Sequence, residues 1–317
     1  DIQQQEVSDD ATFSQPSEYR SMAPSLASSD QVRDAINLLR TASRPLIVAG
    51  SAASYASSGQ VLERLIETAK LPLMTEGSAR GMVSDEHPYC FGFFDSALNR
   101  AARLLKEADV VVLLGRKQDL ILGYAMPPTV NADAKIIQID PSAAEIGRNR
   151  GVAVGIVGDV EAVVGQLTEE AAKHKWTDQP WLNQLHAERR AQAQDLESLA
   201  LPEVPMHAMY VAKALRQHLS PDDCLVFDGG DFCHFARAYL PAVRPKSWWY
   251  IPELGMLGSA LPTAMAAKLA YPDRRVIMLT GDGAFGFNGR NAKAGGADAG
   301  DEIAGEVRRE LQRRVFC

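Results

Sequence analysis

Residues 276–288 join a short apolar run to a Gly-Asp-Gly triplet, and no other segment suggests its chemistry so directly. Val276–Leu279 is typical of a buried strand, and Gly281 and Gly283 would allow a tight turn and a close backbone approach to a ligand. Asp282 offers a carboxylate oxygen of the kind Mg²⁺ prefers, and backbone N–H groups after the turn would suit a phosphate. The pattern fits a Mg²⁺-bridged diphosphate. Taken alone, it fits a plain turn with a solvent-facing Asp slightly better.

Length and charge limit the classes of function. The 317 residues suffice for about two domains, with 46% hydrophobic and 23% charged residues, as in an ordinary globular protein. The net charge of −7 disfavours a nucleic acid or an anionic membrane as partner. No apolar run approaches the ~20 residues of a membrane span.

The four cysteines, Cys90, Cys224, Cys233 and Cys317, show no paired spacing, which favours a reducing cytoplasmic location over a disulfide framework. Beyond the adjacent Cys233 and His234 there is no Cys/His cluster, so a zinc site is not indicated. The chain starts at Asp1 rather than Met, and residues 8–29 are rich in Ser, Ala and Pro. We therefore expect residues 1–29 to be a linker within a longer protein.

Residues 30–172 alternate short apolar runs with amphipathic stretches, which predicts a Rossmann-like α/β domain with a doubly wound parallel sheet. Asp30 is the expected N-cap of the first helix. The expected strands are 44–51, 71–74, 110–114, 135–139 and 152–157, and the expected later helices are 59–70, 96–108 and 160–172.

Ligands of such sheets bind beyond the carboxyl ends of the strands. Those ends carry Gly50-Ser51, Thr75-Glu76-Gly77, Gly115-Arg116 and Asp140. The lack of a Gly-x-Gly-x-x-Gly fingerprint argues against NAD binding in the usual mode. A nucleotide-binding domain and a purely scaffolding domain fit these residues equally well.

A second α/β unit is expected over residues 206–288, after a helix and inter-domain linker at 173–205. It combines strands at Cys224–Phe227 and 275–280 with helices at 207–219 and 259–270. Three glycine-containing segments flank these elements: Asp228-Gly229-Gly230-Asp231, Gly255-Met256-Leu257-Gly258 and Gly281-Asp282-Gly283.

These segments, in this order, resemble the thiamine-diphosphate (ThDP) enzyme superfamily of acetolactate synthase, benzoylformate decarboxylase and 2-hydroxyacyl-CoA lyase. The resemblance extends to Gly77, Gly81 and Glu86-His87-Pro88, and to the run 137–149, and covers residues 1–288. It implies three α/β domains: a first that binds the cofactor pyrimidine and holds a catalytic Glu, a Rossmann-like middle domain that in some members holds FAD or ADP, and a third that binds the diphosphate. This chain would hold the middle domain and a truncated third domain.

The resemblance also implies residue roles. Asp282 would be a Mg²⁺ ligand that holds the diphosphate, with Gly281 beside it and with Gly283 and Ala284 lending backbone N–H groups. The Gly229-Gly230-Asp231 loop would approach the diphosphate from the other side. The Gly255 carbonyl, beside Met256, would accept a hydrogen bond from the 4′-amino group. Leu257 would be the apolar wedge that bends ThDP into a V shape and brings its 4′-imino nitrogen to C2 of the thiazolium.

The implied activity is that of a Mg²⁺-dependent C–C lyase or carboligase acting on 2-keto acids or 2-hydroxyacyl compounds, as a homodimer or homotetramer at full length. Residue types alone leave other roles open. Leu257 would suit a core, Asp228 and Asp231 would suit helix caps, and His234 would suit a packed or surface position. Glu86-His87-Pro88 would suit a turn, Asp140 a ribose contact or an Asp-Pro turn, and Arg116 a phosphate contact or an exposed position.

The resemblance ends at residue 288. Residues 289–317 shift to Gly, Ala, Arg and Asp, and the window at 307–310, where an Asn would complete the Mg²⁺ shell, holds none. We expect an aberrant tail, such as a frameshift product, or else one amphipathic helix near 302–315. Without the catalytic Glu and that Asn, the isolated chain should have negligible ThDP activity. The alternatives are a non-catalytic FAD- or ADP-binding module and an NAD-binding protein, which the absent fingerprint disfavours.

Overall fold

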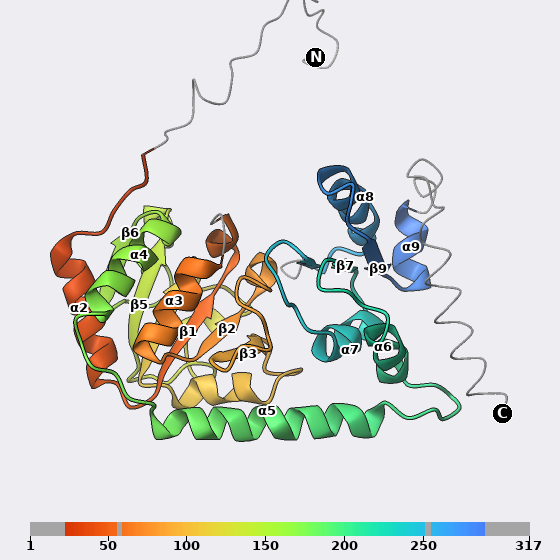
Figure 1. The fold of residues 1–317 in the computed structure, drawn as a ribbon, viewed down its shortest axis with the longest axis horizontal. Helices are drawn as coiled ribbons and strands as arrows, with labels where there is room; N and C mark the ends of the chain where they lie inside the picture. The colour runs from red at the N-terminus through yellow and green to blue at the C-terminus, as the bar shows by residue number, and fades with distance from the viewer. Residues whose placement is uncertain (1–22, 56–58, 251–254, 289–317) are drawn as a thin grey trace, which may run out of the picture.

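The computed structural model describes residues 23–55, 59–250 and 255–288, which form two α/β units (Figure 1). The first unit holds a six-stranded parallel sheet in the order β3-β2-β1-β4-β5-β6. Because successive strands are added on opposite sides of β1, the switch point of the sheet lies between β1 and β4. The strands are β1 (Pro45–Ala49), β2 (Leu73–Thr75), β3 (Cys90–Phe93), β4 (Val110–Leu114), β5 (Lys135–Asp140) and β6 (Val154–Val157).

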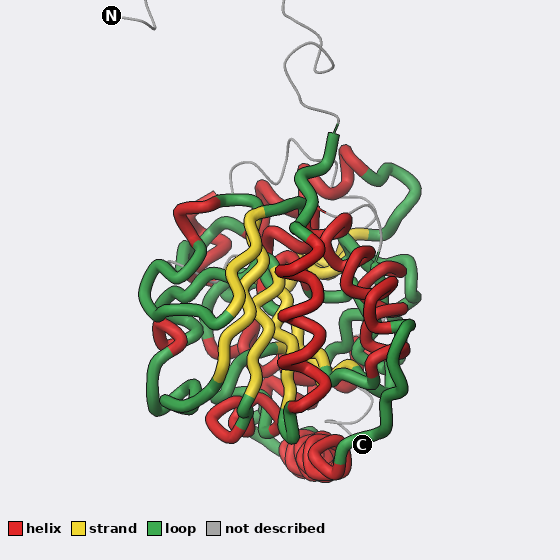
Figure 2. Tube along the Cα trace, turned by 90° about the vertical axis from the view of Figure 1, so that its left-hand side faces the viewer, coloured by secondary structure: helices red, strands yellow, loops and turns green. Residues whose placement is uncertain are grey.

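Alternate strand residues of this sheet enter two separate cores, as the two-residue period of a strand requires. On one face, Ile47 and Val112 pack against α2 (Ser29–Thr41), α3 (Gln60–Ala69) and α4 (Val160–Ala171). On the other face, Leu46 and Val111 pack against the 3₁₀ helix η4 (Ala101–Glu107) and the start of α5 (Pro180–Leu199). Figure 2 shows helices lying along these strands. The predicted doubly wound α/β class is confirmed.

Two local predictions in this unit are wrong. The N-cap of α2 is Ser28, which forms a capping box with Gln31, while Asp30 lies in the first turn, where the helix dipole favours a carboxylate. The helix expected at 96–108 is only the shorter η4. Asn99 donates from Nδ2 to the carbonyls of Phe91 and Phe93 at 2.8 Å each, which holds this segment against β3 in place of a helical turn.

The second unit holds a three-stranded parallel sheet in the order β8-β7-β9. Its strands are β7 (Cys224–Phe227), β8 (Trp248–Tyr250) and β9 (Val276–Leu279). Its helices are α6 (Ala208–Arg216), α7 (Asp231–Tyr239), α8 (Ala260–Ala270) and α9 (Asp282–Asn288). Phe227 and Trp248 pack in its core with ring centroids 4.6 Å apart.

Helix α5 runs along both units rather than leading only into a linker (Figure 1). Trp181 near its start packs in the first unit, and Leu196 near its end packs against the core of the second. Glu197 accepts hydrogen bonds from Lys213 and Tyr239 of the second unit. The helix therefore braces the two units. None of the described helices has the length and apolar character needed to cross a membrane.

Candidate functional site

The glycine-containing segments 228–231 and 281–283 leave the same edge of the second sheet side by side. β7 and β9 are parallel neighbours with Phe227 opposite Leu279. The N–H of Asp228 donates to the Leu279 carbonyl at 2.9 Å, which continues the pairing one residue past the strand. Both loops therefore emerge where ligands of parallel sheets bind.

The side chain of Asp228 connects the remaining glycine-containing segment, residues 255–258, to this edge. Its side chain is 1% exposed, and Oδ1 accepts from the N–H groups of Gly229 and Gly258 at 2.9 Å each. Oδ2 accepts from the Ala260 N–H and the Thr280 hydroxyl at 3.3 Å. One buried carboxylate thus joins the loops after β7 and β9 to the loop before α8. Residue types alone suggested only a helix cap for Asp228, so its positioning role is new.

Leu257 lies directly over Gly229. A Cβ at position 229 would stand 2.6 Å from Leu257 Cδ2, so only glycine leaves this leucine where it is. The Leu257 side chain is 47% exposed and Met256 is 49% exposed, so neither is a core residue. An exposed leucine held beside a glycine loop suits the wedge role that the resemblance implies.

The Gly-Asp-Gly triplet is not the tight turn expected from sequence. The chain passes from β9 through Thr280 and Gly281 directly into α9, whose first residue is Asp282. Neither Gly281 nor Gly283 has a positive φ, so the backbone path does not require glycine at either position. A Cβ at either position would meet no atom within 4 Å. The remaining physical reason for glycine at these positions is that it leaves open space in which a ligand could approach the backbone closely.

Two further glycines border open space and do need their backbone freedom. Gly230 has φ +98° and Gly255 has φ +57°, a region that residues with a Cβ rarely adopt. A Cβ at either would also meet no atom within 4 Å. Asp231, the first residue of α7, is exposed next to Gly230. At Gly230 and Gly255, as at Gly281 and Gly283, a ligand could therefore contact the backbone directly.

The charges of the three segments demand a cation if a diphosphate binds. Asp228, Asp231 and Asp282 lie in or beside them, and they contain no Lys or Arg. Carboxylates repel a diphosphate unless a divalent ion lies between them. Asp282 is exposed, and its Oδ1 accepts from the Gly283 N–H at 2.8 Å. Its Oδ2 has no donor within the described ranges. The residues present therefore fit a Mg²⁺-bridged diphosphate, with the Ala284 N–H in the same first helical turn.

Helix α9 is docked onto the loop that carries Leu257. The amide of Asn288 donates from Nδ2 to the Gly258 carbonyl at 2.8 Å. A Cβ on Gly258, which has φ +84°, would stand 2.7 Å from Phe287 Cβ. Asn288 thus has a positioning contact. The window at 307–310 lies outside the described residues.

The switch point of the first sheet is filled by protein. A Cβ on Gly50 would stand 2.6 Å from Arg116 Cδ, so the loops after β1 and β4 pack tightly. Arg116 is 3% exposed, which corrects the exposed position considered from sequence. It pairs with Asp119 at 2.5 Å and with Glu76 at 3.3 Å. A phosphate at this edge would have to compete with both carboxylates.

Asp140 lies at the end of β5 and is 3% exposed. Its Oδ1 accepts from the Ser142 N–H at 2.9 Å, which forms the turn that the Asp-Pro sequence suggested. Burial raises the pKa of Asp140, and the nearby Glu145 adds to the rise. The structure therefore supports a turn role for Asp140 and leaves a ribose contact as a prediction.

Glu63, Glu67 and His87 bring their ligand atoms within 4.8 Å of one another, a grouping that could suit a metal. However, His87 Nδ1 accepts from the Tyr89 N–H at 3.2 Å, so the proton of a neutral ring lies on Nε2. That nitrogen faces Glu67 Oε1 at 3.2 Å. His87 lies in a turn, with its N–H donating to the Ser84 carbonyl at 3.0 Å, and contacts Glu67 of α3, in keeping with the turn considered for Glu86-His87-Pro88.

His234 is half-buried on α7 and contacts Arg237, which donates to its Nδ1. Burial, followed by the Arg237 charge, lowers the pKa of His234. The Arg237 guanidinium carbon lies 3.4 Å from the centroid of the Tyr250 ring. His234 is thus a packed histidine, one of the two positions that residue types suggested.

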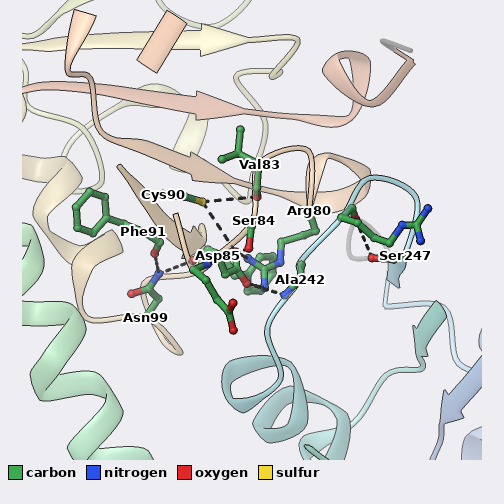
Figure 3. Close-up of polar contacts among 12 residues, drawn as sticks. Arg80, Val83, Ser84, Asp85, Cys90, Phe91, Asn99, Ala242 and Ser247 are labelled. Carbon is green, nitrogen blue, oxygen red and sulfur yellow. Dashed lines mark hydrogen bonds and ion pairs between the residues drawn. The ribbon is translucent and has the colours of Figure 1, made fainter. Parts of the chain in front are cut away.

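The segment with Gly77 and Gly81 docks the two units together (Figure 3). Arg80 is 2% exposed and pairs with both oxygens of Asp85, at 2.8 and 2.6 Å. The Asp85 N–H donates to the Ala242 carbonyl at 2.9 Å, and Asp85 Oδ2 accepts from the Ala242 N–H at 2.8 Å. The Arg80 guanidinium carbon lies 4.8 Å from the Trp248 ring centroid. This contact sets the second sheet against the first unit.

Comparisons with known proteins agree with this arrangement. Residues 32–167 match the family model described as thiamine pyrophosphate enzyme, central domain, and residues 228–294 match the C-terminal TPP binding domain. Human 2-hydroxyacyl-CoA lyase 1 is 33% identical over 280 residues, which are 85% of this chain and 47% of that protein.

Other relatives carry different names. The acetolactate synthase large subunit of Mycobacterium tuberculosis is 34% identical over 263 residues, 82% of this chain and 46% of that protein. Oxalyl-CoA decarboxylase of Escherichia coli is 30% identical over 262 residues, 81% of this chain and 45% of that protein. The chain spans about half the length of the curated relatives it matches.

Proposed function

The chain belongs to the ThDP-dependent enzyme superfamily, and on that premise we propose that it forms part of a Mg²⁺-dependent enzyme that cleaves or joins C–C bonds. The proposed substrates are 2-keto acids or 2-hydroxyacyl compounds, in keeping with the names of its relatives. One observation carries the proposal: Asp228 fastens three loops around open, glycine-lined space beside the exposed Asp282.

In this proposal each loop has its own task. Asp282 holds Mg²⁺, and the N–H groups of Gly283 and Ala284 donate to diphosphate oxygens. Gly229, Gly230 and Asp231 border the diphosphate on the side of β7. Asp228 touches no ligand and acts by holding the loops in register.

ThDP, when bound, supplies a thiazolium carbon that can become a carbanion and attack a carbonyl. The residues of this chain hold and orient that group. The Gly255 carbonyl accepts a hydrogen bond from the aminopyrimidine, with Met256 beside it. Leu257, which lies against Gly229, would be the apolar residue that keeps bound ThDP bent and keeps water away from it. A small polar residue at position 257 would do neither.

We also propose that turnover needs residues beyond those described. The two matching family models are those of the central and C-terminal domains, whereas the resemblance places the catalytic Glu in a first domain. The isolated chain should therefore bind ThDP with negligible turnover. Assembly as a homodimer or homotetramer and a cytoplasmic location belong to the same proposal.

The alternative is a non-catalytic module that binds FAD or ADP in the first unit. Such a ligand would have to displace Asp119 or Glu76 from Arg116 at the switch point. The open space at the three loops of the second unit needs no comparable displacement. The geometry therefore supports ThDP more than it supports the nucleotides.

Isothermal titration of the purified chain separates the two proposals. ThDP with Mg²⁺ should give saturable heat, and ThDP with EDTA should not. FAD and ADP, titrated in the same buffer, should bind more weakly than ThDP. Tight FAD or ADP binding with no ThDP heat would favour the nucleotide module and contradict the assignment of the three loops.

A further inference from the structure

A cavity of about 380 Å³ lies at the seam between the two units, apart from the three loops described above. Small-molecule sites typically enclose about 300–1,000 Å³. The first unit contributes Glu86, which adjoins the Asp85 contact with Ala242, and the second unit contributes Arg216 at the end of α6. Ser84 of the first unit and Ser247 of the second also line the cavity, and Figure 3 labels both near that contact.

The wall provided by the second unit is mainly apolar. Leu225 of β7 lines it together with Leu219, Pro241 and Val243. Leu225 is otherwise buried, at 4% exposure, and two residues further along β7 stands Phe227 of the core. An aliphatic group in the cavity would therefore lie against the sheet whose far end carries Asp228.

Three charged side chains line the cavity, and the charge of one of them, Arg216, also acts on Glu197 outside it, after the larger effects of the Lys213 and Tyr239 hydrogen bonds on that carboxylate. Asp223 is not available, because Arg275 pairs with it at 2.5 Å and the Ser220 N–H donates to it at 2.7 Å. Within the described ranges, neither Glu86 nor Arg216 forms an ion pair, although both line this cavity. The Arg216 guanidinium carbon lies 5.8 Å from the centroid of the Tyr239 ring. The two opposite charges thus stay separate across a space with an apolar wall.

We propose that this seam cavity binds a small zwitterion with an aliphatic side chain, such as an α-amino acid. Arg216 presents the fork of N–H donors that matches a carboxylate. Glu86 accepts from the ammonium group, and the side chain lies against Leu219, Leu225 and Val243. A simple anion would meet Glu86, and a simple cation would meet Arg216, so a ligand with both charges fits best. Such a ligand would bridge the two units beside Asp85 and Ala242.

Isothermal titration with L-leucine tests this site without any cofactor present. Two analogues each lack one charge: 4-methylpentanoate lacks the amine, and 3-methylbutylamine lacks the carboxylate. Each should bind about tenfold more weakly than leucine or worse, because a charge-assisted hydrogen bond is lost. Glu86→Gln and Arg216→Gln should each weaken leucine binding similarly. Glu203→Gln, at an exposed position outside the cavity, is the control.

Hydrogen exchange locates the binding. Leucine should slow amide exchange around residues 84–86 and 241–247 and leave the segment 280–288 unchanged. Glu86 and Arg216 are both exposed, so their variants should unfold at the same urea concentration as the parent chain. No heat at millimolar leucine would overturn the proposal. Equal binding of 4-methylpentanoate, or unchanged binding by both variants, would do so as well.

Discussion

Asp228 accepts a hydrogen bond of 2.9 Å from the N–H of Gly258, so a buried carboxylate at the end of β7 fixes the loop that starts α8. The same side chain accepts from the Thr280 hydroxyl after β9. Leu257 and Asp282 are therefore placed by one residue that faces no solvent. Such preorganisation reduces the ordering that a ligand would otherwise have to impose.

Asp228→Asn should destabilise the second unit by about 2 kcal/mol, because an amide NH₂ would face donors that now share a carboxylate. Urea denaturation followed by tryptophan fluorescence measures the loss. Asp273→Asn, at an exposed position near α8, should change stability by less than about 0.5 kcal/mol. Equal stability of Asp228→Asn and the parent chain would show that the carboxylate does not join the loops.

Gly229→Ala should weaken ThDP binding by about tenfold while leaving the fold intact, because the new Cβ must push Leu257 aside. Leu257 is half-exposed, so displacing its side chain should barely change the urea midpoint. Gly165→Ala, within α4 where a Cβ meets no atom within 4 Å, is the matched control and should stabilise by about 0.5–1 kcal/mol. Undiminished ThDP affinity in Gly229→Ala would show that the position of Leu257 does not matter for ThDP binding.

Asp85→Asn should cost about 3 kcal/mol of stability, because Arg80 would remain buried without its charged partner. Adding Arg80→Met should recover much of this loss, since the methionine would lie against Trp248 and Phe93 with no charge to bury. Urea unfolding of the single and double variants measures both effects. If the second substitution fails to restore stability, the loss arises from the Ala242 contact rather than from the ion pair.

Asp140 should make stability depend on pH in a defined direction. Burial raises its pKa, so the folded state binds its proton more readily than the unfolded state does. The cost of burying the ionised group is present above the folded pKa and is relieved as pH falls through it. Asp140→Asn, whose Oδ1 can still accept from Ser142, should be more stable than the parent chain near pH 7. The advantage should disappear below about pH 4. Urea midpoints at several pH values measure it, and a pH-independent difference would contradict the cause given.

The two strands that escaped sequence-based prediction, β3 and β8, are apolar but short or irregular. Val110–Leu114 and Cys224–Phe227 were predicted to the residue because each is continuously apolar and buried. β3 contains Gly92 with φ +79° and shifts register against β2. β8 is three residues long and becomes a strand by pairing with β7. Tertiary contacts, rather than local pattern, define both.

The same distinction holds at the site. The three loops and Asp282 could be singled out because their order along the chain resembles a known family, and the structure brings the loops together. The task of Asp228 could not be predicted, because three of its four donors come from positions 30 to 52 residues away in the chain. The burial of Arg116 depends likewise on Glu76, which follows a different strand. Contacts between strand ends carry no short sequence signature.

The most direct test of the account is the Mg²⁺ dependence of ThDP binding to the chain and to Asp282→Asn. Asp282 is exposed, so its substitution should leave the urea midpoint unchanged while it abolishes the Mg²⁺-dependent heat of ThDP binding. Asp273→Asn should bind as the parent chain does. Mg²⁺-dependent ThDP binding that survives in Asp282→Asn would contradict the central claim that this carboxylate holds the metal.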